Sequence, residues 1–152
     1  MISTAGYAAP SADAPFGPLT FERRDTGARD VRIDILFCGV CHSDLHTARS
    51  EWPGTVYPCI PGHEIVGRVT EAGADVTGFK VGQIVGVGCM VDSCQHCASC
   101  AEGLEQYCES GMTGTYNSPD KHTGRVTYGG YSKTIELVRD AQHELLVYDD
   151  RL

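Results

Sequence analysis

Four cysteines within fifteen residues constrain this chain more than any other feature of its sequence. In the stretch CQHCASCAEGLEQYC, the spacing is C-x2-C-x2-C-x7-C, with the cysteines at positions Cys94, Cys97, Cys100 and Cys108. Thiolate is a soft ligand, and four thiolates satisfy the tetrahedral geometry that zinc prefers. The longer spacer contains Gly103, so it can turn back to close a site. A four-thiolate site has no open position, which makes its zinc structural rather than catalytic.

Three other interpretations of these cysteines compete with zinc. They are free buried thiols, a redox-active C-x2-C pair and an iron–sulfur cluster. Free thiols rarely cluster four times at such spacing, and the iron–sulfur motif usually continues with x3-C-P, which this sequence lacks. Zinc is therefore favoured. We refer to residues 92–110 as the cysteine lobe.

Length and composition indicate an ordinary soluble domain. The chain has 152 residues, enough for one domain with a substantial core, and is 41% hydrophobic and 21% charged. Its net charge of -8 argues against a nucleic-acid or anionic-membrane partner. The first residues contain neither a basic start nor a long apolar run, so we expect no signal peptide and no membrane span. We therefore expect a cytoplasmic protein, whose eight cysteines stay reduced and favour metal binding over disulfides.

The rest of the chain favours strands. Short apolar stretches alternate with a period near two and are separated by glycine, proline and aspartate. Every second residue from Val31 to Phe37 is apolar, which predicts one buried face. Residues 39–52 favour a short helix, and residues 115–130 are typical of a long surface loop. We predict a mainly β, barrel-like domain with short helices, carrying the cysteine lobe.

A second group of possible metal ligands lies upstream of the lobe. A catalytic zinc typically has three protein ligands and one open position. Cys41 and His63 could supply two of them, so a third is needed. Glu64 follows His63 directly, and on a strand the two side chains would point to opposite faces, which favours Glu64 as an alternate or indirect ligand. Asp44 is a candidate to hydrogen-bond the other ring nitrogen of His63.

Each of these residues also has an ordinary structural interpretation. Taken alone, Cys41 could be a small buried hydrophobe, and His63 could be a hydrogen-bonded structural residue. The remaining cysteines, Cys38, Cys59 and Cys89, stand in apolar stretches and are predicted to be core thiols. Only the joint pattern indicates a site.

That joint pattern resembles the zinc-dependent medium-chain alcohol dehydrogenases. The stretch GHEIVGRVTEAGADV matches their zinc signature, G-H-E-x2-G-x5-G-x2-V, at every fixed position: Gly62, His63, Glu64, Gly67, Gly73 and Val76. The stretches CGVCHSDLH and SEWPGTVYPCIPGHE resemble the cinnamyl-alcohol-dehydrogenase branch, which includes bacterial aldehyde reductases. The resemblance continues through the cysteine lobe and GGYS to about residue 132.

The resemblance implies a GroES-like β-barrel catalytic domain over residues 1–152, incomplete at its C-terminal end, with the cysteine lobe as its structural-zinc lobe. Cys41 and His63 would bind the catalytic zinc, and Glu64 would approach it during ligand exchange. Family members supply a third protein ligand, a cysteine, further along the chain, and no cysteine follows Cys108 here. A Rossmann domain is expected to be absent, because no G-x-G-x-x-G follows a strand.

The resemblance also implies roles for residues around the catalytic zinc. The zinc would polarise the substrate oxygen while hydride passes between substrate and NADP(H), the cofactor of this branch. Ser43 would take the alcohol proton, and His46, at i+3, would pass it towards solvent. His42 and Ser43 are the expected cofactor-facing positions. Trp52 would line the substrate pocket, although an ordinary core or surface aromatic is the alternative.

We therefore expect a zinc-dependent, NADP(H)-linked enzyme that interconverts small primary alcohols and aldehydes. The 152 residues alone are expected to be a fragment with little or no activity, and full-length relatives are expected to be homodimers. The alternative is a non-catalytic, zinc-stabilised β domain that serves as a binding or assembly module. The motifs CHSDLH and GHE discriminate against that alternative, because a scaffold needs no second metal pair, hydroxyl and relay histidine.

Overall fold

Strands dominate the computed structural model, which describes residues 1–138 and 145–147. The strands are β1 (Ile2–Ala8), β2 (Gly17–Arg23), β3 (Asp30–Cys38), β4 (Ile65–Ala72), β5 (Ile84–Val87), β6 (Met90–Asp92), β7 (Thr113–Gly114), β8 (Thr134–Val138) and β9 (Leu145–Val147). The helical elements are α1 (His42–Ala48), α2 (Ala98–Ala101) and the 3-10 turn η1 (Glu105–Tyr107). The prediction of a mainly β domain with short helices is confirmed. No helix in the described residues is long and apolar enough to cross a membrane.

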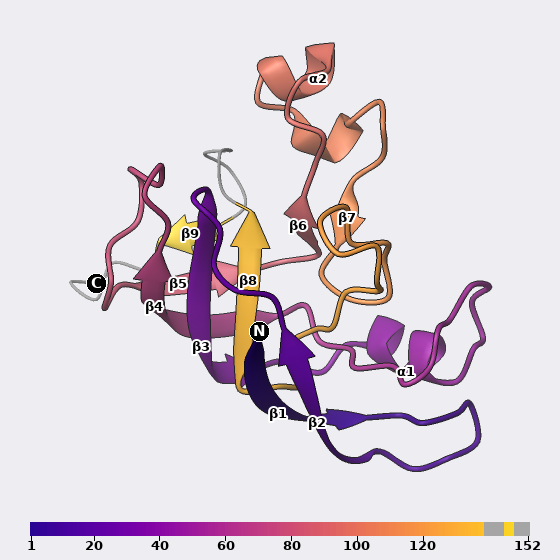
Figure 1. The fold of residues 1–152 in the computed structure, drawn as a ribbon. Coiled ribbons are helices and arrows are strands. Elements are labelled where there is room, and N and C mark those ends of the chain that lie inside the picture. Colours follow the sequence, from indigo (N-terminus) through magenta and orange to yellow (C-terminus); the bar gives the residue numbers. More distant parts are fainter. Residues whose placement is uncertain (139–144, 148–152) are drawn as a thin grey trace.

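The core lies on one antiparallel sheet with strand order β8-β3-β4-β5-β9. Two smaller pairs, β1-β2 and β6-β7, flank it (Figure 1). The alternating apolar residues of β3, β4, β5 and β8 supply fully buried side chains, among them Val31, Ile33, Val69, Val85 and Ile135. The period-two pattern in the sequence therefore located the centre of the core correctly.

The predicted apolar face of β3 ends before Phe37. The pairing of β3 with β4 shifts register between Ile35 and Phe37, and the Phe37 side chain is 73% exposed. A bulge inserts an extra residue, and a one-residue slip moves a side chain to the other face of the sheet. The prediction that Phe37 shares one face of the strand with Val31 and Ile33 is thus wrong.

A buried ionic cluster ties the N-terminal hairpin to the middle of β8. Arg23 and Arg32 both pair with the carboxylate of Glu136, whose side chain is 3% exposed. The Arg23 guanidinium also donates to the carbonyl oxygens of Tyr128 and Gly129, at 2.9 and 3.2 Å. Burial lowers the pKa of Arg23 to about 10, which leaves it charged at neutral pH. These bonds fix the course of the segment that leads into β8.

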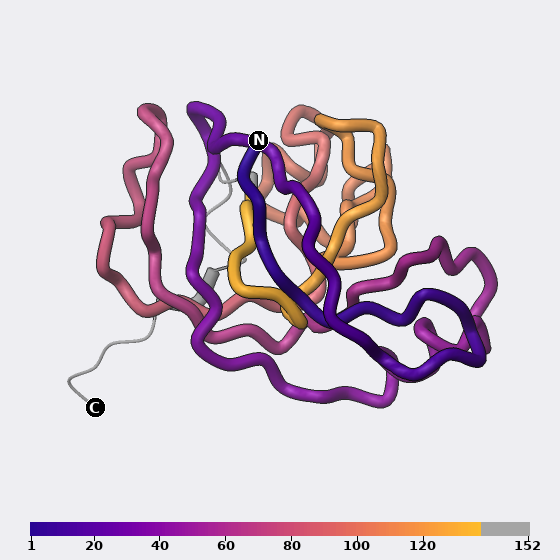
Figure 2. The backbone as a smooth tube through the Cα atoms, turned by 60° about the horizontal axis from the view of Figure 1, so that its bottom comes forward, coloured from indigo at the N-terminus to yellow at the C-terminus, as the bar shows by residue number. Residues whose placement is uncertain are grey.

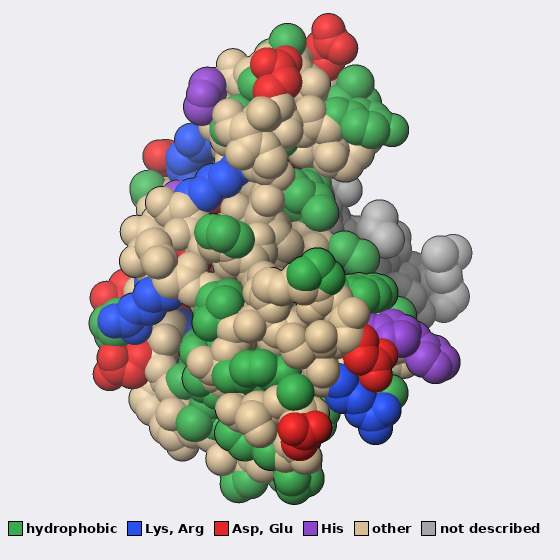
Figure 3. All heavy atoms as spheres, turned by 90° about the vertical axis from the view of Figure 1, so that its right-hand side faces the viewer, with side chains coloured by type: hydrophobic (Ala, Val, Ile, Leu, Met, Phe, Trp, Pro, Cys, Tyr) green, Lys and Arg blue, Asp and Glu red, His purple; other side chains and the backbone are tan. Residues whose placement is uncertain are grey.

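The cysteine lobe projects from the sheets between β6 and β7, at the top of Figure 1. On another side of the molecule, α1 and the loop after it extend past the sheet edge (Figures 1 and 2). Figure 2 also shows the N-terminal hairpin running beside the segment before β8, where Gly6 bridges Ser132. The face that carries α1 has small groups of hydrophobic side chains, with acidic and basic ones next to each other (Figure 3).

Candidate metal centres and the adjoining cleft

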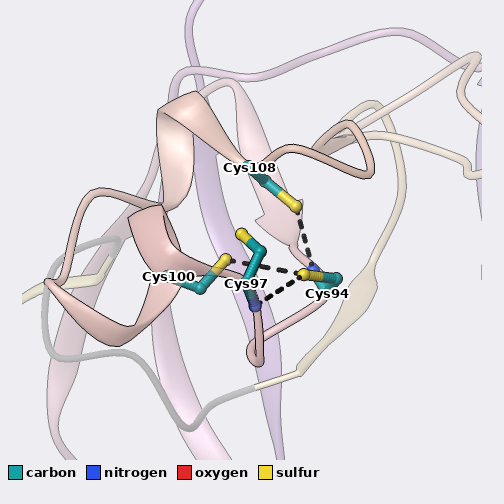
Figure 4. A group of neighbouring side chains, drawn as sticks. All are labelled: Cys94, Cys97, Cys100 and Cys108. Carbon is teal, nitrogen blue, oxygen red and sulfur yellow. Dashed lines mark hydrogen bonds between the residues drawn. The ribbon is translucent and has the colours of Figure 1, made fainter.

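The four sulfur atoms of the cysteine lobe converge on one point (Figure 4). All four lie within 4.8 Å of one another. Cys97 precedes α2 as its N-cap, Cys100 lies within α2, and Cys108 ends η1. Gly103, at φ +74°, lets the chain turn back after α2. The short helices and this turn are what bring the distant fourth cysteine to the other three.

Backbone amides and neighbouring thiols set the charge state of the lobe sulfurs. Hydrogen bonding from the His96 amide, with a further one from Cys97, lowers the pKa of Cys94 to about 5. The Ser93 hydroxyl favours the Cys100 thiolate, but burial and the nearby thiols outweigh it and raise its pKa to about 11. Adjacent thiolates repel one another, so a bound cation is needed for all four to ionise. The donor set therefore fits a thiophilic metal such as zinc.

A second cluster joins Cys41, His63 and Glu64. One ligand atom from each lies within 4.8 Å of the others, and the group is less buried than the lobe site. Cys41 stands at the N-cap of α1, while His63 and Glu64 precede β4. The expectation that His63 and Glu64 diverge is wrong, because these two residues do not lie on a strand.

Close backbone approach gives the Glu64 side chain its position. The amide of Gly39 donates to the carbonyl oxygen of Glu64 at 2.8 Å. A Cβ atom on Gly39 would lie 2.2 Å from Glu64 Oε2, so only glycine leaves room for the carboxylate to turn towards Cys41. Glu64 is thereby placed as a direct candidate ligand.

Hydrogen bonds orient the His63 ring. Its Nδ1 lies 3.2 Å from Asp44 Oδ1, and its Nε2 lies 3.5 Å from the hydroxyl of Ser43. An Nδ1–H that donates to Asp44 leaves Nε2 as the acceptor, whose lone pair can take either the Ser43 hydroxyl or a metal. The Asp44 carboxylate is 2% exposed, so this orientation is shielded from competing water.

A cleft of about 320 Å³ opens beside the second cluster. The expected site residues Ser43, Trp52 and His63 all line it, together with Thr47, Pro53, Thr55, Cys89, Thr115, Tyr116 and Asn117. A metal bound by the second cluster would thus lie next to a space large enough for a small organic molecule.

Several of these lining residues escaped the sequence analysis. Tyr116 and Asn117 belong to a stretch predicted to be a surface loop, yet the Tyr116 ring lies 5.7 Å from that of His63. Cys89, predicted to be a core thiol, is exposed and lines the cleft, so that prediction is wrong. The local sign that Tyr116 and Asn117 belong to a site is that an aromatic and an amide side chain stand next to each other in a stretch of turn-forming residues.

The remaining expected residues gather around α1. His46 pairs through Nδ1 with the Glu51 carboxylate, and its ring stacks on Trp52 with a centroid distance of 5.1 Å. His42 is exposed, and its ring lies 6.0 Å from that of His46. Trp52 therefore both lines the cleft and packs on His46. The pairing of His46 with Glu51 was not predicted from the sequence.

The sheet with its projecting lobe is the architecture of a GroES-like domain. Residues 27–146 match the family described as "Alcohol dehydrogenase GroES-like domain". The chain belongs to this family, which confirms the resemblance found in the sequence.

Individual relatives come from the branch that the sequence indicated. Aldehyde reductase YahK of Escherichia coli is 58% identical over 125 residues, which are 82% of this chain and 36% of YahK. NADP-dependent alcohol dehydrogenase C of Mycobacterium tuberculosis is 51% identical over 149 residues, 98% of this chain and 42% of the relative. The cinnamyl alcohol dehydrogenase structure from Helicobacter pylori, complexed with NADP(H), superposes with a TM-score of 0.89 at 44% identity, covering 97% of this chain and 42% of the other. This chain thus spans about two-fifths of the length of these relatives.

Proposed function

We propose that this chain is the zinc-binding catalytic part of an NADP(H)-dependent alcohol dehydrogenase or aldehyde reductase. The observation that carries the proposal is the Cys41–His63–Glu64 cluster, which opens onto a cleft beside the Ser43 hydroxyl. The names of the relatives, an aldehyde reductase and NADP-dependent alcohol dehydrogenases, support it. Because the chain spans only part of those enzymes, the activity is assigned to the complete enzyme, and we expect little from the 152 residues alone.

Two zinc ions are proposed, with different roles. Cys94, Cys97, Cys100 and Cys108 would hold one of them as a structural metal, because four thiolates leave no open position. Cys41, His63 and Glu64 would hold the other. When bound there, zinc supplies Lewis acidity at the substrate oxygen. In domain terms, we propose that residues 1–152 form the GroES-like catalytic domain, with the cysteine lobe at residues 92–110.

The side chains around the cleft would carry the proton. Ser43 would take the proton of an alcohol bound in the cleft, and its hydroxyl lies 3.5 Å from His63 Nε2. His46 would pass it towards solvent, and its partner Glu51 lies at the exposed end of that route. Asp44 holds His63 and moves no proton itself.

Cofactor and substrate would meet at the mouth of the cleft. We assign His42 and Ser43 to the cofactor side, and hydride would pass between the nicotinamide and the substrate carbon. Trp52 and Tyr116 offer aromatic surfaces, which suits aromatic or medium-chain primary alcohols and their aldehydes. None of the eight cysteines forms a disulfide, which supports the cytoplasmic location that we propose.

Metal stoichiometry tests the proposal against a non-catalytic, zinc-stabilised module. We expect about two zinc ions per folded chain, one lost in Cys41→Ser and the other lost in Cys100→Ser. One zinc per chain, unaffected by Cys41→Ser, would favour the module. In the complete enzyme, Ser43→Ala is expected to lower kcat for aldehyde reduction by roughly 100-fold or more, as is typical for loss of a proton-transfer group.

A further inference from the structure

The residues just before His63 are held by a segment from the far end of the sequence. Three backbone bonds join residues 129–131 to residues 60–62. Gly129 N donates to the Ile60 carbonyl oxygen at 2.7 Å, Gly130 N to that of Gly62 at 2.9 Å, and Tyr131 N to that of Pro61 at 3.0 Å. The loop that presents His63 is thus held by backbone hydrogen bonds to residues 129–131.

The two glycines of this segment permit that approach. A Cβ atom on Gly129 would lie 2.5 Å from the carbonyl oxygens of both Pro61 and Gly62. One on Gly130 would lie 2.5 Å from Ile65 Cγ1 and 2.7 Å from the Cys38 sulfur. Contacts below 3 Å with backbone atoms force the chain apart, so a larger residue would displace the His63 loop.

The side chain of Tyr131 reaches from this segment to Asp44. Its hydroxyl donates to Asp44 Oδ2 at 3.1 Å. The same oxygen accepts the Cys41 amide at 3.0 Å, while Oδ1 accepts the Gly62 amide at 3.0 Å and His63 Nδ1 at 3.2 Å. Each carboxylate oxygen therefore has two donors, and the buried group has no need of water.

Removal of the Tyr131 hydroxyl would unbalance this arrangement. Oδ2 would keep only the Cys41 amide, and a buried carboxylate that loses a donor rotates or shifts to recover one. Any rotation moves Oδ1 relative to His63 Nδ1, since both oxygens turn together. The orientation of the ring is thereby coupled to the hydroxyl of a residue that belongs neither to the Cys41–His63–Glu64 cluster nor to the lining of the cleft.

We propose that Tyr131 is a positioning residue, which acts through Asp44 to hold His63 with Nε2 directed at the metal. This inference rests on the proposed role of the Cys41–His63–Glu64 cluster. The Tyr131 backbone is anchored on both sides, because its carbonyl oxygen also accepts the Tyr7 amide at 2.8 Å. Its ring packs edge-on against Phe16 with a centroid distance of 6.0 Å, a contact that phenylalanine would retain.

The test compares Tyr131→Phe with a matched tyrosine that does not contact Asp44. Tyr57 serves as the control, because its hydroxyl donates to the Ala48 carbonyl oxygen at 2.8 Å, at the end of α1. Both variants lose one hydroxyl hydrogen bond. The full chain, with its lobe filled by one equivalent of zinc, is titrated with cobalt and followed by visible absorption. In the same samples before cobalt, ring 15N chemical shifts report the tautomer of His63.

Tyr131→Phe is expected to weaken cobalt binding at the second cluster roughly tenfold, as loss of outer-layer hydrogen bonds does in other metal sites. It should also convert the single Nδ1–H tautomer of His63 into a mixture. Tyr57→Phe should stay within about twofold of the parent and keep one tautomer. In an Asp44→Asn background, Tyr131→Phe should weaken cobalt binding by less than about a further twofold, because the carboxylate through which Tyr131 acts is no longer present.

Two results bear on the inference and the proposed function separately. If Tyr131→Phe matches Tyr57→Phe in both cobalt affinity and tautomer, Tyr131 is only structural and the inference is overturned. If the parent chain takes up no cobalt beyond the lobe, the proposed metal centre fails. The tautomer of His63 then still decides whether Tyr131 sets its orientation, since that signal needs no metal.

Discussion

The two clusters of candidate metal ligands are assembled in opposite ways. The lobe draws all four sulfurs from residues 94–108, and their backbone supplies the hydrogen bonds around them. The second cluster draws Cys41 and His63 from segments 22 residues apart, and the carboxylate that orients His63 is itself held from residue 131. A local site can be organised by its metal, whereas a distributed site depends on the fold being formed first. The lobe should therefore control stability, and the second cluster should control chemistry.

The largest effect is expected from breaking the local site. Cys100→Ser should abolish tight zinc binding by the lobe and lower the midpoint of thermal unfolding by about 10 °C, since a loss of about 3 kcal/mol moves a domain of this size by roughly 3 °C per kcal/mol. Calorimetry and metal analysis measure both quantities. Cys89→Ser, at an exposed cysteine outside both clusters, is the control. Equal melting of the two variants would contradict a structural role for the lobe.

Breaking the distributed site should leave stability almost unchanged. His63→Asn should weaken metal binding at the second cluster by at least about 100-fold, because it removes a direct ligand, while the unfolding midpoint moves by less than about 3 °C. His122→Asn is a matched control, since His122 also pairs with a carboxylate, that of Asp92 at 3.2 Å. Loss of the lobe metal in His63→Asn would show that the two sites are not independent.

A backbone change can separate the two sites without touching a ligand. Gly129→Ala places a Cβ atom against two backbone carbonyl oxygens and should cost about 2 kcal/mol of unfolding free energy. Because the clash lies beside residues 61–62, cobalt affinity should fall at the second cluster only. Gly78→Ala, where a Cβ atom would meet nothing within 4 Å, is the comparison. Weaker metal binding by the cysteine lobe in Gly129→Ala would contradict this prediction.

The smallest expected effect concerns the rate at which the buried thiol of Cys59 is alkylated. Burial raises the pKa of Cys59 from 9.0 to about 11, so at pH 8 its thiolate fraction is about 100-fold below that of an ordinary thiol. Its rate of reaction with iodoacetamide should rise about tenfold per pH unit between pH 8 and 10. Mass spectrometry of the modified peptides would measure this in the zinc-loaded chain, with exposed Cys89 reacting before Cys59. Early modification of Cys59 would show that it is not buried as described.

The contrast between the clusters also explains what the sequence could predict. The clustering of the lobe cysteines could be foreseen, because all four lie within fifteen residues and the spacer contains a glycine that can turn the chain back. Alternating residues such as Val31 and Ile33 located the core for the same local reason. The face of Phe37 was predicted wrongly because the register shift depends on how β3 pairs with β4. The sequence of β3 alone gives no sign of it.

The contributions from residues 115–131 were missed for a similar reason. Their composition correctly indicates turns, but composition does not say what a turn covers. Tyr116 faces His63 and Tyr131 reaches Asp44 only because the chain returns to residues 60–63 after the lobe. Asp44 was foreseen because it stands close to Cys41 in a recognisable motif. Its fourth donor lies 87 residues away and required the folded structure.

The central claim, one local sulfur site and one fold-dependent mixed site, is tested most directly by zinc X-ray absorption on the chain loaded with one and then two equivalents. The first equivalent should show only sulfur neighbours at about 2.3 Å, and the second should add nitrogen or oxygen neighbours at about 2.0 to 2.1 Å. His63→Asn should remove the second component and leave the first. A spectrum that stays all-sulfur as zinc is added, or that shows nitrogen at the first equivalent, would contradict the account.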